Sequence, residues 1–312
     1  MEKSLILKLK KAMATLKMKY SYGMKKIIDF IYYRIVPEKI FLKYKFRKTF
    51  GYHLNLKTPI TLNEKMQWLK LYDRTELHTI CADKFLVRQF VEDRIGNQYL
   101  IPLLFNSSNL DELNAKKFPN YPFIIKSNNG CGTNFIVRDK SIVDWGLVKV
   151  LCAKWLKTNN YYQGKEWQYK NIKPQIIVEK LLESSEGKIP NDYKFHCFHG
   201  KVECIYVSID REGKNKRNIY DKEWNPLLFT WARKNKDFKN IRGEEIQKPI
   251  NLKKMIELAE ILSSSFRFVR VDFYNLDGEI YFGELTFHHG SGFDHIRPNE
   301  WDTKLGKKLN LK

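Results

Sequence analysis

The chain has 312 residues, of which 43% are hydrophobic and 14% aromatic, so it can bury a sizeable core and is not expected to be disordered. Its formal net charge is +21, an excess that calls for an acidic partner or another physical reason. The five cysteines are scattered without a C-x-x-C pair, which indicates reduced thiols in a reducing, cytoplasmic compartment.

The N-terminal region, residues 1–57, is basic and patterned as helix. It contains 15 Lys and Arg against 3 Asp and Glu, a net charge of +12. Apolar residues recur at helical spacing in two stripes, of which the second ends before Pro37. The stripes are Leu5, Leu9, Met13 and Leu16, then Ile27, Ile31 and Ile35. No stretch is apolar for long enough to span a bilayer, and no secretory signal is recognisable.

Three interpretations of this basic region stay open. Its helices pack on the rest of the protein with the lysines solvated, or they hold the protein peripherally at the anionic inner face of a membrane, or they bind nucleic acid. The chain shows no helix-turn-helix, zinc-finger or RNP-type pattern, so nucleic acid is the least favoured partner.

Residues 58–119 are predicted to be mainly helical. Thr61 and Glu64 form a capping box for a helix whose apolar positions are Met66, Leu69 and Tyr72. Asp83 is expected to cap a second helix, which carries Phe85, Leu86, Phe90 and Val91 and ends at Gly96. The run "YLIPLLFN" then predicts a short buried strand. The absence of G-x-G-x-x-G and G-x-x-x-x-G-K-[ST] patterns argues against a Rossmann site and a P-loop.

The stretch "YPFIIKSNNGCGTNFIVRD" predicts a strand ending at Lys126, a glycine-containing loop at 127–133, and a second strand at 135–137. A lysine at a strand end beside such a loop suits phosphate, because glycines let backbone N–H groups approach the oxygens and the ammonium supplies charge. A plain hairpin with a flexible turn is the alternative.

Further along, a strand at 176–178 leads into Glu179, and a hairpin follows at 193–198 and 202–209. Lys194 lies on the strand face opposite Phe195. The local cluster of His196, Cys197, His199 and Cys204 would allow a zinc site. The alternative is a hairpin that turns at His199-Gly200-Lys201.

The segment "RVDFYNLDGEIYFGELTFHHGSGF" predicts two strands joined at Asp277-Gly278, with Asp272 and Glu284 facing each other. Such a pair suits Mg²⁺, which takes one or two carboxylates plus phosphate oxygens. Three histidines lie beside the glycine-rich loop that follows: His288, His289 and His295. Either one of them is a general base, or all have structural or substrate contacts.

In this order, the lysine strand with its glycine loop, the E-x-x-hydrophobic segment at Glu179 and the "RVDF…GEIYFGE" hairpin resemble the ATP-grasp superfamily of carboxylate–amine ligases. "FGYHLNLKTPITLNEKMQWLKLYDR", "ADKFLVRQFV" and "DYKFHCFHGK" are similar to its TupA-like branch, which serves teichuronopeptide and capsular polysaccharide synthesis. The resemblance implies an α+β ATP-grasp fold in which two subdomains clamp ATP. The implied division is a basic helical region 1–57, a helical region 58–119, a lid subdomain 120–178 and a C-terminal subdomain 179–312.

The resemblance also implies ATP and Mg²⁺ as cofactors and a role for each matching residue. It implies that Lys126 and Lys194 contact phosphate oxygens and that Lys84 makes a further phosphate contact. It implies that the segment that begins at Glu179 binds adenine through backbone groups of Lys180 and Leu182, and that Asp192 binds the ribose hydroxyls. It implies that Asp272 and Glu284 bind the metal and that Arg270 stabilises the acyl phosphate. Arg270 and Lys126 are then the two catalytic residues. Thr286 stands where many members have Asn, so the resemblance does not establish a second metal.

The implied activity is an ATP-dependent ligase that joins an amine or amino acid to a uronic acid through an acyl phosphate. Its substrate would be a surface polysaccharide precursor: a uronic-acid-containing glycan or a nucleotide- or lipid-linked sugar. The alternative is a glycosyltransferase of capsular or other surface polysaccharide synthesis, although the chain lacks a D-x-D triplet. A third class is a non-catalytic or nucleic-acid-binding protein that uses the basic region.

Overall fold

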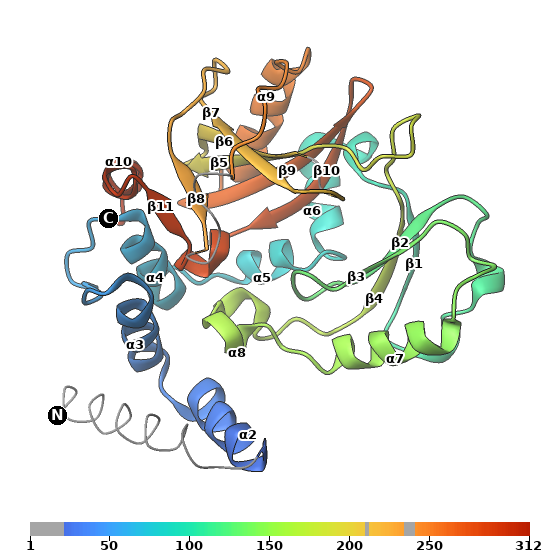
Figure 1. The fold of residues 1–312 in the computed structure, drawn as a ribbon, viewed down its shortest axis with the longest axis horizontal. Coiled ribbons are helices and arrows are strands. Elements are labelled where there is room, and N and C mark those ends of the chain that lie inside the picture. The colour runs from blue at the N-terminus through green and yellow to red at the C-terminus, as the bar shows by residue number, and fades with distance from the viewer. Residues whose placement is uncertain (1–21, 210–211, 234–240) are drawn as a thin grey trace.

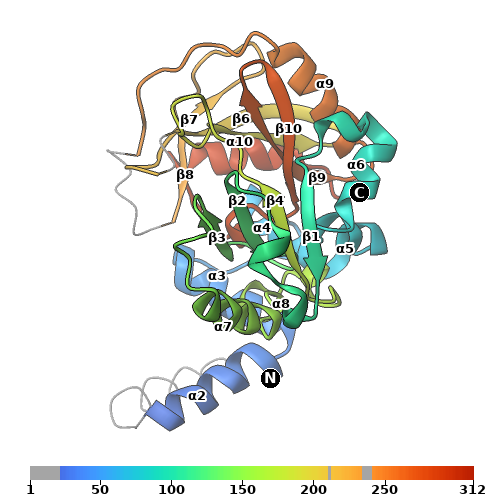
Figure 2. The same ribbon diagram turned by 90° about the vertical axis from the view of Figure 1, so that its right-hand side faces the viewer.

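Two antiparallel sheets dominate the fold (Figures 1 and 2), and residues of both line a cavity between them. The computed structural model describes residues 22–209, 212–233 and 241–312. No helix in these three ranges is both long and apolar enough to cross a bilayer.

The N-terminal helices are α2 (Tyr22–Phe30), the π-helical η1 (Ile31–Ile35) and α3 (Glu38–Phe50). The prediction that the second apolar stripe is helical and ends before Pro37 is confirmed, whereas the first stripe lies outside the described residues. In α3, Phe41, Leu42 and Phe46 are buried. In contrast, α2 extends away from the body of the protein in both views.

The predicted capping box is present at the start of α4 (Leu62–Tyr72). Glu64 N–H donates to Thr61 Oγ1 (3.2 Å), and Thr61 N–H donates to Glu64 Oε2 (3.1 Å). After α5 (Glu76–Ala82), Asp83 Oδ1 accepts from Phe85 N–H (2.8 Å) and Leu86 N–H (3.2 Å), and α6 (Val87–Ile95) ends at Gly96 as expected. The helix therefore starts later than predicted, because the Asp83 carboxylate holds these two N–H groups in the turn before it.

The small sheet has the order β1-β4-β2-β3. Its strands are β1 (Leu103–Ser107), β2 (Phe123–Ser127), β3 (Asn134–Val137) and β4 (Ile176–Lys180). Alternate residues of β2 are buried, and Phe123 and Ile125 pack in one core with Val148 of α7 (Trp145–Leu156). Short helical turns connect these elements: η2 (Asn97–Tyr99), η3 (Leu110–Glu112), η4 (Ala115–Lys117), α8 (Tyr161–Gly164) and η5 (Trp167–Tyr169).

The large sheet has the order β10-β9-β5-β6-β7. Its strands are β5 (Asp192–Phe198), β6 (Lys201–Ile209), β7 (Lys216–Tyr220), β9 (Phe268–Leu276) and β10 (Glu279–Thr286). One face packs on α9 (Leu252–Ser263). The hairpin turning between Phe198 and Lys201 is confirmed. The zinc alternative has no support, because the described part of the chain contains no group of three or more His, Cys, Asp or Glu able to hold a metal.

The opposite face of the large sheet is covered at one end only. The covering elements are α4, β8 (Thr230–Ala232), η6 (His289–Gly292), β11 (His295–Arg297) and α10 (Glu300–Lys308). They bury Trp231 and Phe268 in one apolar cluster with Leu62, Met66 and Leu69 of α4. The rest of this face is directed at the small sheet, and there it forms one wall of the cleft.

Candidate active site

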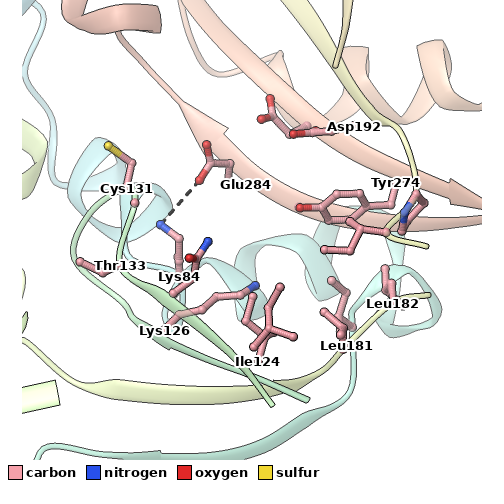
Figure 3. A pocket seen from close by; sticks show the side chains of 18 of the residues that line it. Lys84, Ile124, Lys126, Cys131, Thr133, Leu181, Leu182, Asp192, Tyr274 and Glu284 are labelled. Atoms are coloured by element: carbon pink, nitrogen blue, oxygen red, sulfur yellow. Dashed lines mark ion pairs between the residues drawn. The ribbon is translucent and has the colours of Figure 1, made fainter. Parts of the chain in front are cut away.

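A cavity of about 280 Å³ lies between the two sheets (Figure 3). Most of the residues expected to form the site line it: Lys84, Lys126, Leu182, Asp192, Lys194, Asp272 and Glu284. Glu179, Lys180 and Arg270 lie beside it, and two of these three hold lining side chains in place. The fold thus places charged residues around one cavity. They come from the turn before α6, from both sheets and from the segment that connects the sheets.

On the small-sheet side, Lys126 is positioned by Glu179. Its Nζ donates to Glu179 Oε2 (2.7 Å), while Arg88 NH1 lies 3.3 Å from Oε1 of the same carboxylate. Burial alone would lower the pKa of Lys126, but the charge and hydrogen bond of Glu179, together with the charges of Tyr274 and Glu284, raise it. Lys126 is therefore a cation at the cavity wall. Arg88 was not foreseen, although it follows Lys84 at helical spacing, which is the available signal.

The segment that follows β4 has one backbone N–H group that is free to bind a ligand. Lys180 N–H donates to Pro102 O and Leu181 N–H donates to Pro122 O, both at 3.0 Å. Among the described residues, the Leu182 N–H has no hydrogen-bond partner. Of the two expected adenine contacts, Leu182 can therefore still donate, whereas the Lys180 N–H is already used within the sheet.

On the large-sheet side, Lys194 lies between two carboxylates. Its Nζ donates to Asp272 Oδ2 (2.7 Å) and to the neighbouring Asp192. Burial alone would lower the pKa of Lys194, but these two carboxylates raise it above its usual value. Asp192 Oδ1 is buried without a hydrogen-bond partner among the described residues, so it remains free to accept from a ligand hydroxyl.

The hairpin of β9 and β10 does bring Asp272 and Glu284 opposite each other, as predicted, but it needs a β-bulge to do so. The pairing runs regularly from Leu276–Glu279 to Phe273–Phe282 and then shifts, so that Asp272 faces Glu284 rather than Gly283. Without this extra residue Glu284 would share the core-facing side of Phe282. A Cβ at Gly283 would lie 3.1 Å from Asp272 O, which explains the glycine in the bulge.

Arg270 binds both carboxylates of this pair. Its Nε and NH2 donate to Asp272 Oδ1 and Oδ2 (2.6 Å each), and NH2 also donates to Glu284 Oε1 (2.8 Å). Burial alone would raise the pKa of Glu284, but Lys84, Arg270 and Lys194 lower it to about 2. Burial raises the pKa of Asp272 despite Arg270 and Lys194. Glu284 is thus a fixed anion. Lys84 Nζ lies 3.6 Å from Glu284 Oε2, and Figure 3 shows the lysine pointing at the carboxylate.

The donor set fits a single Mg²⁺. Asp272 and Glu284 supply hard, anionic oxygens at adjoining register positions, and nucleotide phosphates commonly complete such a site. The cations that now neutralise these carboxylates would share them with the metal. Thr286 Oγ1 donates to Glu284 Oε1 (3.0 Å), so Thr286 orients the carboxylate.

Two of the histidines considered as general bases hold structural hydrogen bonds. Arg270 NH1 donates to His289 Nδ1 (2.7 Å), which fixes the neutral tautomer of His289. Gln168 Nε2 lies 3.2 Å from His288 Nδ1. Burial first, and then nearby cations, lowers the pKa of both rings well below its usual value. Both rings are therefore neutral at physiological pH.

Two facing antiparallel sheets, lysines from both, and a carboxylate pair on the large sheet define an ATP-grasp enzyme. Residues 64–310 match the model of the TupA-like ATPgrasp family, and the chain belongs to that family. This confirms the expected α+β ATP-grasp fold, with its helical N-terminal region, and the expectation of an enzyme that uses ATP. No match was found among curated protein sequences.

Solved structures with a similar fold include two ligases. D-alanine-D-alanine ligase from Helicobacter pylori is 16% identical (TM-score 0.44) over 80% of this chain and 69% of its own. L-amino acid ligase from Bacillus licheniformis is 15% identical (TM-score 0.45) over 83% of this chain and 57% of its own. The chain spans 57% of the length of a D-alanine–D-alanine ligase from Bacillus anthracis. Similarity at this level concerns the fold and says nothing of the substrate.

Proposed function

We propose that the protein is an ATP-dependent carboxylate–amine ligase that joins an amine or amino acid to a uronic acid on a surface polysaccharide precursor. The observation that carries the proposal is the charge arrangement of the cleft: Lys84, Lys126 and Lys194 converge on the cavity that Asp272 and Glu284 also line. Cations placed around a carboxylate pair suit phosphoryl transfer, which requires little beyond positioning and neutralisation of the phosphate oxygens.

In this proposal the residues of the cleft divide the nucleotide between them. The Leu182 N–H and the Glu179 segment face adenine, the free Oδ1 of Asp192 accepts from a ribose hydroxyl, and Lys126 and Lys194 donate to phosphate oxygens. Mg²⁺ held by Asp272 and Glu284 would neutralise phosphate charge when bound. Each assignment uses a group that lines the cavity or borders it.

The chemistry proceeds through an activated carboxylate. A carboxylate is a poor acyl donor because its oxygen leaves badly, and transfer of the γ-phosphoryl group makes it a good one. Arg270 stands beside the metal-site pair, and its guanidinium stabilises the negative charge that develops when the amine attacks the acyl phosphate. The small sheet, residues 120–178 with β1, acts as a lid that excludes water from this intermediate.

The function is tested by incubating the protein with ATP and Mg²⁺, glucuronic or galacturonic acid, and a panel of amines, and by measuring ADP and phosphate. Hydroxylamine, included as a trap, converts an acyl phosphate to a hydroxamate that is measured separately. We expect nucleotide hydrolysis that depends on the uronic acid. A glycosyltransferase would instead consume a nucleotide sugar without ATP, and that result would replace the proposal.

We also propose that α2 and η1 dock the enzyme on an anionic membrane surface, where polysaccharide precursors on lipid carriers would be met. All three residues of the second stripe are exposed: Ile27 by 55%, Ile31 by 42% and Ile35 by 62%. The stripe therefore does not pack on the domain. Phe30 is also exposed, and the cations Lys26 and Arg34 flank these apolar residues. An apolar face bordered by cations complements acidic lipid.

A further inference from the structure

A second group of charges lies on the cleft-facing side of the large sheet, beyond Lys194. Arg217 on β7 pairs with Ser208, which pairs with Asp192, so Arg217 shares the face that carries Asp192 and Lys194. Arg233 directly follows Ala232 at the end of β8, and Asp294 directly precedes His295, the residue that pairs with Ala232, so Arg233 and Asp294 flank the same end of this ribbon. Arg217, Arg233 and Arg270 all act electrostatically on Asp294.

Protein groups match these charges only in part: the Arg217 guanidinium carbon lies 5.8 Å from the centre of the Tyr206 ring, and Arg233 is exposed to solvent. Asp294 is 8% exposed, yet among the described residues its carboxylate accepts no hydrogen bond and has no ion-pair partner within reach. Arg217 Nε is buried without a partner, and so are Trp231 Nε1 and both ring nitrogens of His196 nearby. Leaving a buried polar or charged group unpaired is costly, so such a concentration indicates a place for a ligand.

The same group borders the reaction centre. Tyr206 pairs with Lys194 across β5 and β6. Its hydroxyl interacts electrostatically with the charges of Arg217, Lys194, Asp294 and Arg270. Arg270 in turn contacts both metal-site carboxylates. A molecule held between Asp294 and Arg217 would therefore lie beside the residue assigned to the acyl phosphate. The ring of His289 lies 5.5 Å from that of Tyr206 and forms part of the same wall.

We propose that Asp294, Arg217 and Arg233 form the acceptor subsite, and that the acceptor is an amino acid: Asp294 receives its ammonium group and the two arginines receive its carboxylate. This rests on the proposed function and selects an amino acid over a simple amine. One anion facing two cations is the complement of a zwitterion, and planar guanidinium groups suit a carboxylate.

The step balances with Asp294 as proton acceptor. The ammonium group gives one proton to the Asp294 carboxylate, and the free amine forms the C–N bond to the acyl carbon. The C–O bond to phosphate then breaks, and the second amine proton leaves with the phosphate. Burial raises the pKa of Asp294 to about 6 despite Arg233, Arg217 and Arg270, which is close to the value that suits proton transfer near neutral pH.

The test compares two nucleophiles in the full-length enzyme with ATP, Mg²⁺ and a uronic acid. The first is a set of amino acids (glycine, alanine, glutamate and lysine), and the second is hydroxylamine, which carries no carboxylate and is largely unprotonated at neutral pH. In Arg217→Gln and Arg233→Gln we expect KM for the amino acid to rise about tenfold or more, since a charge-assisted hydrogen bond is lost. KM for ATP and the hydroxylamine reaction should be unchanged. Arg94→Gln, a change at an exposed arginine of α6, is the matched control.

Asp294→Asn should lower kcat with the amino acid and remove the acidic limb of its pH profile, while hydroxylamine restores much of the rate. Equal losses with both nucleophiles, in any of the three variants, would overturn the subsite. If no uronic acid yields hydroxamate in the wild type, the proposed function fails. Equilibrium dialysis of the labelled amino acids then tests the subsite separately. Binding to the wild type that Arg217→Gln abolishes supports the subsite, whereas equal binding to both proteins, or no binding to the wild type, overturns it.

Discussion

Arg270 holds both carboxylates of the proposed metal site, and this contact would determine which charges a nucleotide meets on entering the cleft. With Lys194 on Asp272 and Lys84 near Glu284, the pair is neutralised before any phosphate arrives. Breaking one partner of a buried charge group leaves the others uncompensated, so conservative changes are more informative here than truncations.

Asp272→Asn or Glu284→Gln should lower ATP turnover by about 100-fold or more, because each keeps the shape of the side chain and removes an anionic ligand for the cation that neutralises the phosphates. ADP release measures turnover, and circular dichroism verifies the fold. Glu279→Gln, an exposed change at the start of the same strand, should behave as wild type. Unchanged ADP release from both site variants would refute the metal assignment.

Asp294 should lower stability at neutral pH, as a carboxylate kept for a ligand would. Its pKa is raised from 3.8 to about 6, so the folded protein binds the proton more tightly than the unfolded chain. The contribution of Asp294 to the free energy of unfolding is therefore fully present below pH ~4 and is lost as the pH rises to about 6.

Asp294→Asn should therefore stabilise the protein by roughly 3 kcal/mol above pH ~6 and by little below pH ~4. Thermal melts of both proteins across this range test the difference. Asp302→Asn is the contrast, since Asp302 accepts hydrogen bonds from Asn63 N–H and Nδ2 (3.0 Å each) and should lose stability. A destabilised Asp294→Asn protein at neutral pH would identify Asp294 as structural.

At the scale of elements, Lys84 and Arg88 join the small sheet and its glycine loop to the helical part of the body. Lys84 N–H donates to Asn128 O (3.0 Å) and Lys84 Nζ to Gly130 O (2.5 Å), while Arg88 reaches Glu179. Both oxygens lie in the glycine loop that follows β2. An element attached in this way can open and close around a ligand without disturbing either sheet.

Hydrogen exchange across residues 126–134 should therefore slow when a non-hydrolysable ATP analogue binds with Mg²⁺, because the loop closes over the phosphates. Exchange in α9, on the far face of the large sheet, should not change and serves as the internal control. Identical exchange in the loop with and without the analogue, with binding confirmed by calorimetry, would exclude a closing lid.

At the scale of the whole molecule, the uneven charge and the projecting α2 suggest how the enzyme meets its substrate. Much of the positive charge belongs to residues 1–57, whereas the cavity of the proposed active site lies between the sheets. Attraction to an acidic surface falls with salt, since exposed charges are screened over about 8–10 Å at physiological ionic strength.

Full-length protein should therefore co-sediment with phosphatidylserine-containing vesicles at low salt and less at high salt. Deletion of residues 1–30, or the triple change Ile27→Ser, Ile31→Ser and Ile35→Ser, should weaken sedimentation and leave ATP binding intact. Ile250→Ser is the matched control, since Ile250 is 97% exposed elsewhere. Equal sedimentation of all variants, or a stripe that instead mediates self-association in ultracentrifugation, would contradict membrane docking.

Much of this molecule can be predicted from local sequence, because secondary structure follows from side-chain sterics and periodicity over a few residues. The Thr61–Glu64 capping box, the stop at Gly96 and the hairpin turn before Lys201 are encoded in this way. The lysine strand and the carboxylate hairpin are likewise recognisable as patterns, and they were sufficient to indicate the family.

Other features depend on how the strands are assembled. The bulge at Gly283 that turns Glu284 toward Asp272 depends on the fit between β10 and β9, and alternation alone would place Glu284 on the core side. Asp294, Arg217 and Arg233 carry no local signal. They act on one another because the sheet order places β7, with Arg217, beside β6, and because the pairing of β8 with β11 brings Arg233 and Asp294 to the same end of that ribbon. Such contacts result from many weak packing interactions between distant segments, which no short stretch of sequence contains.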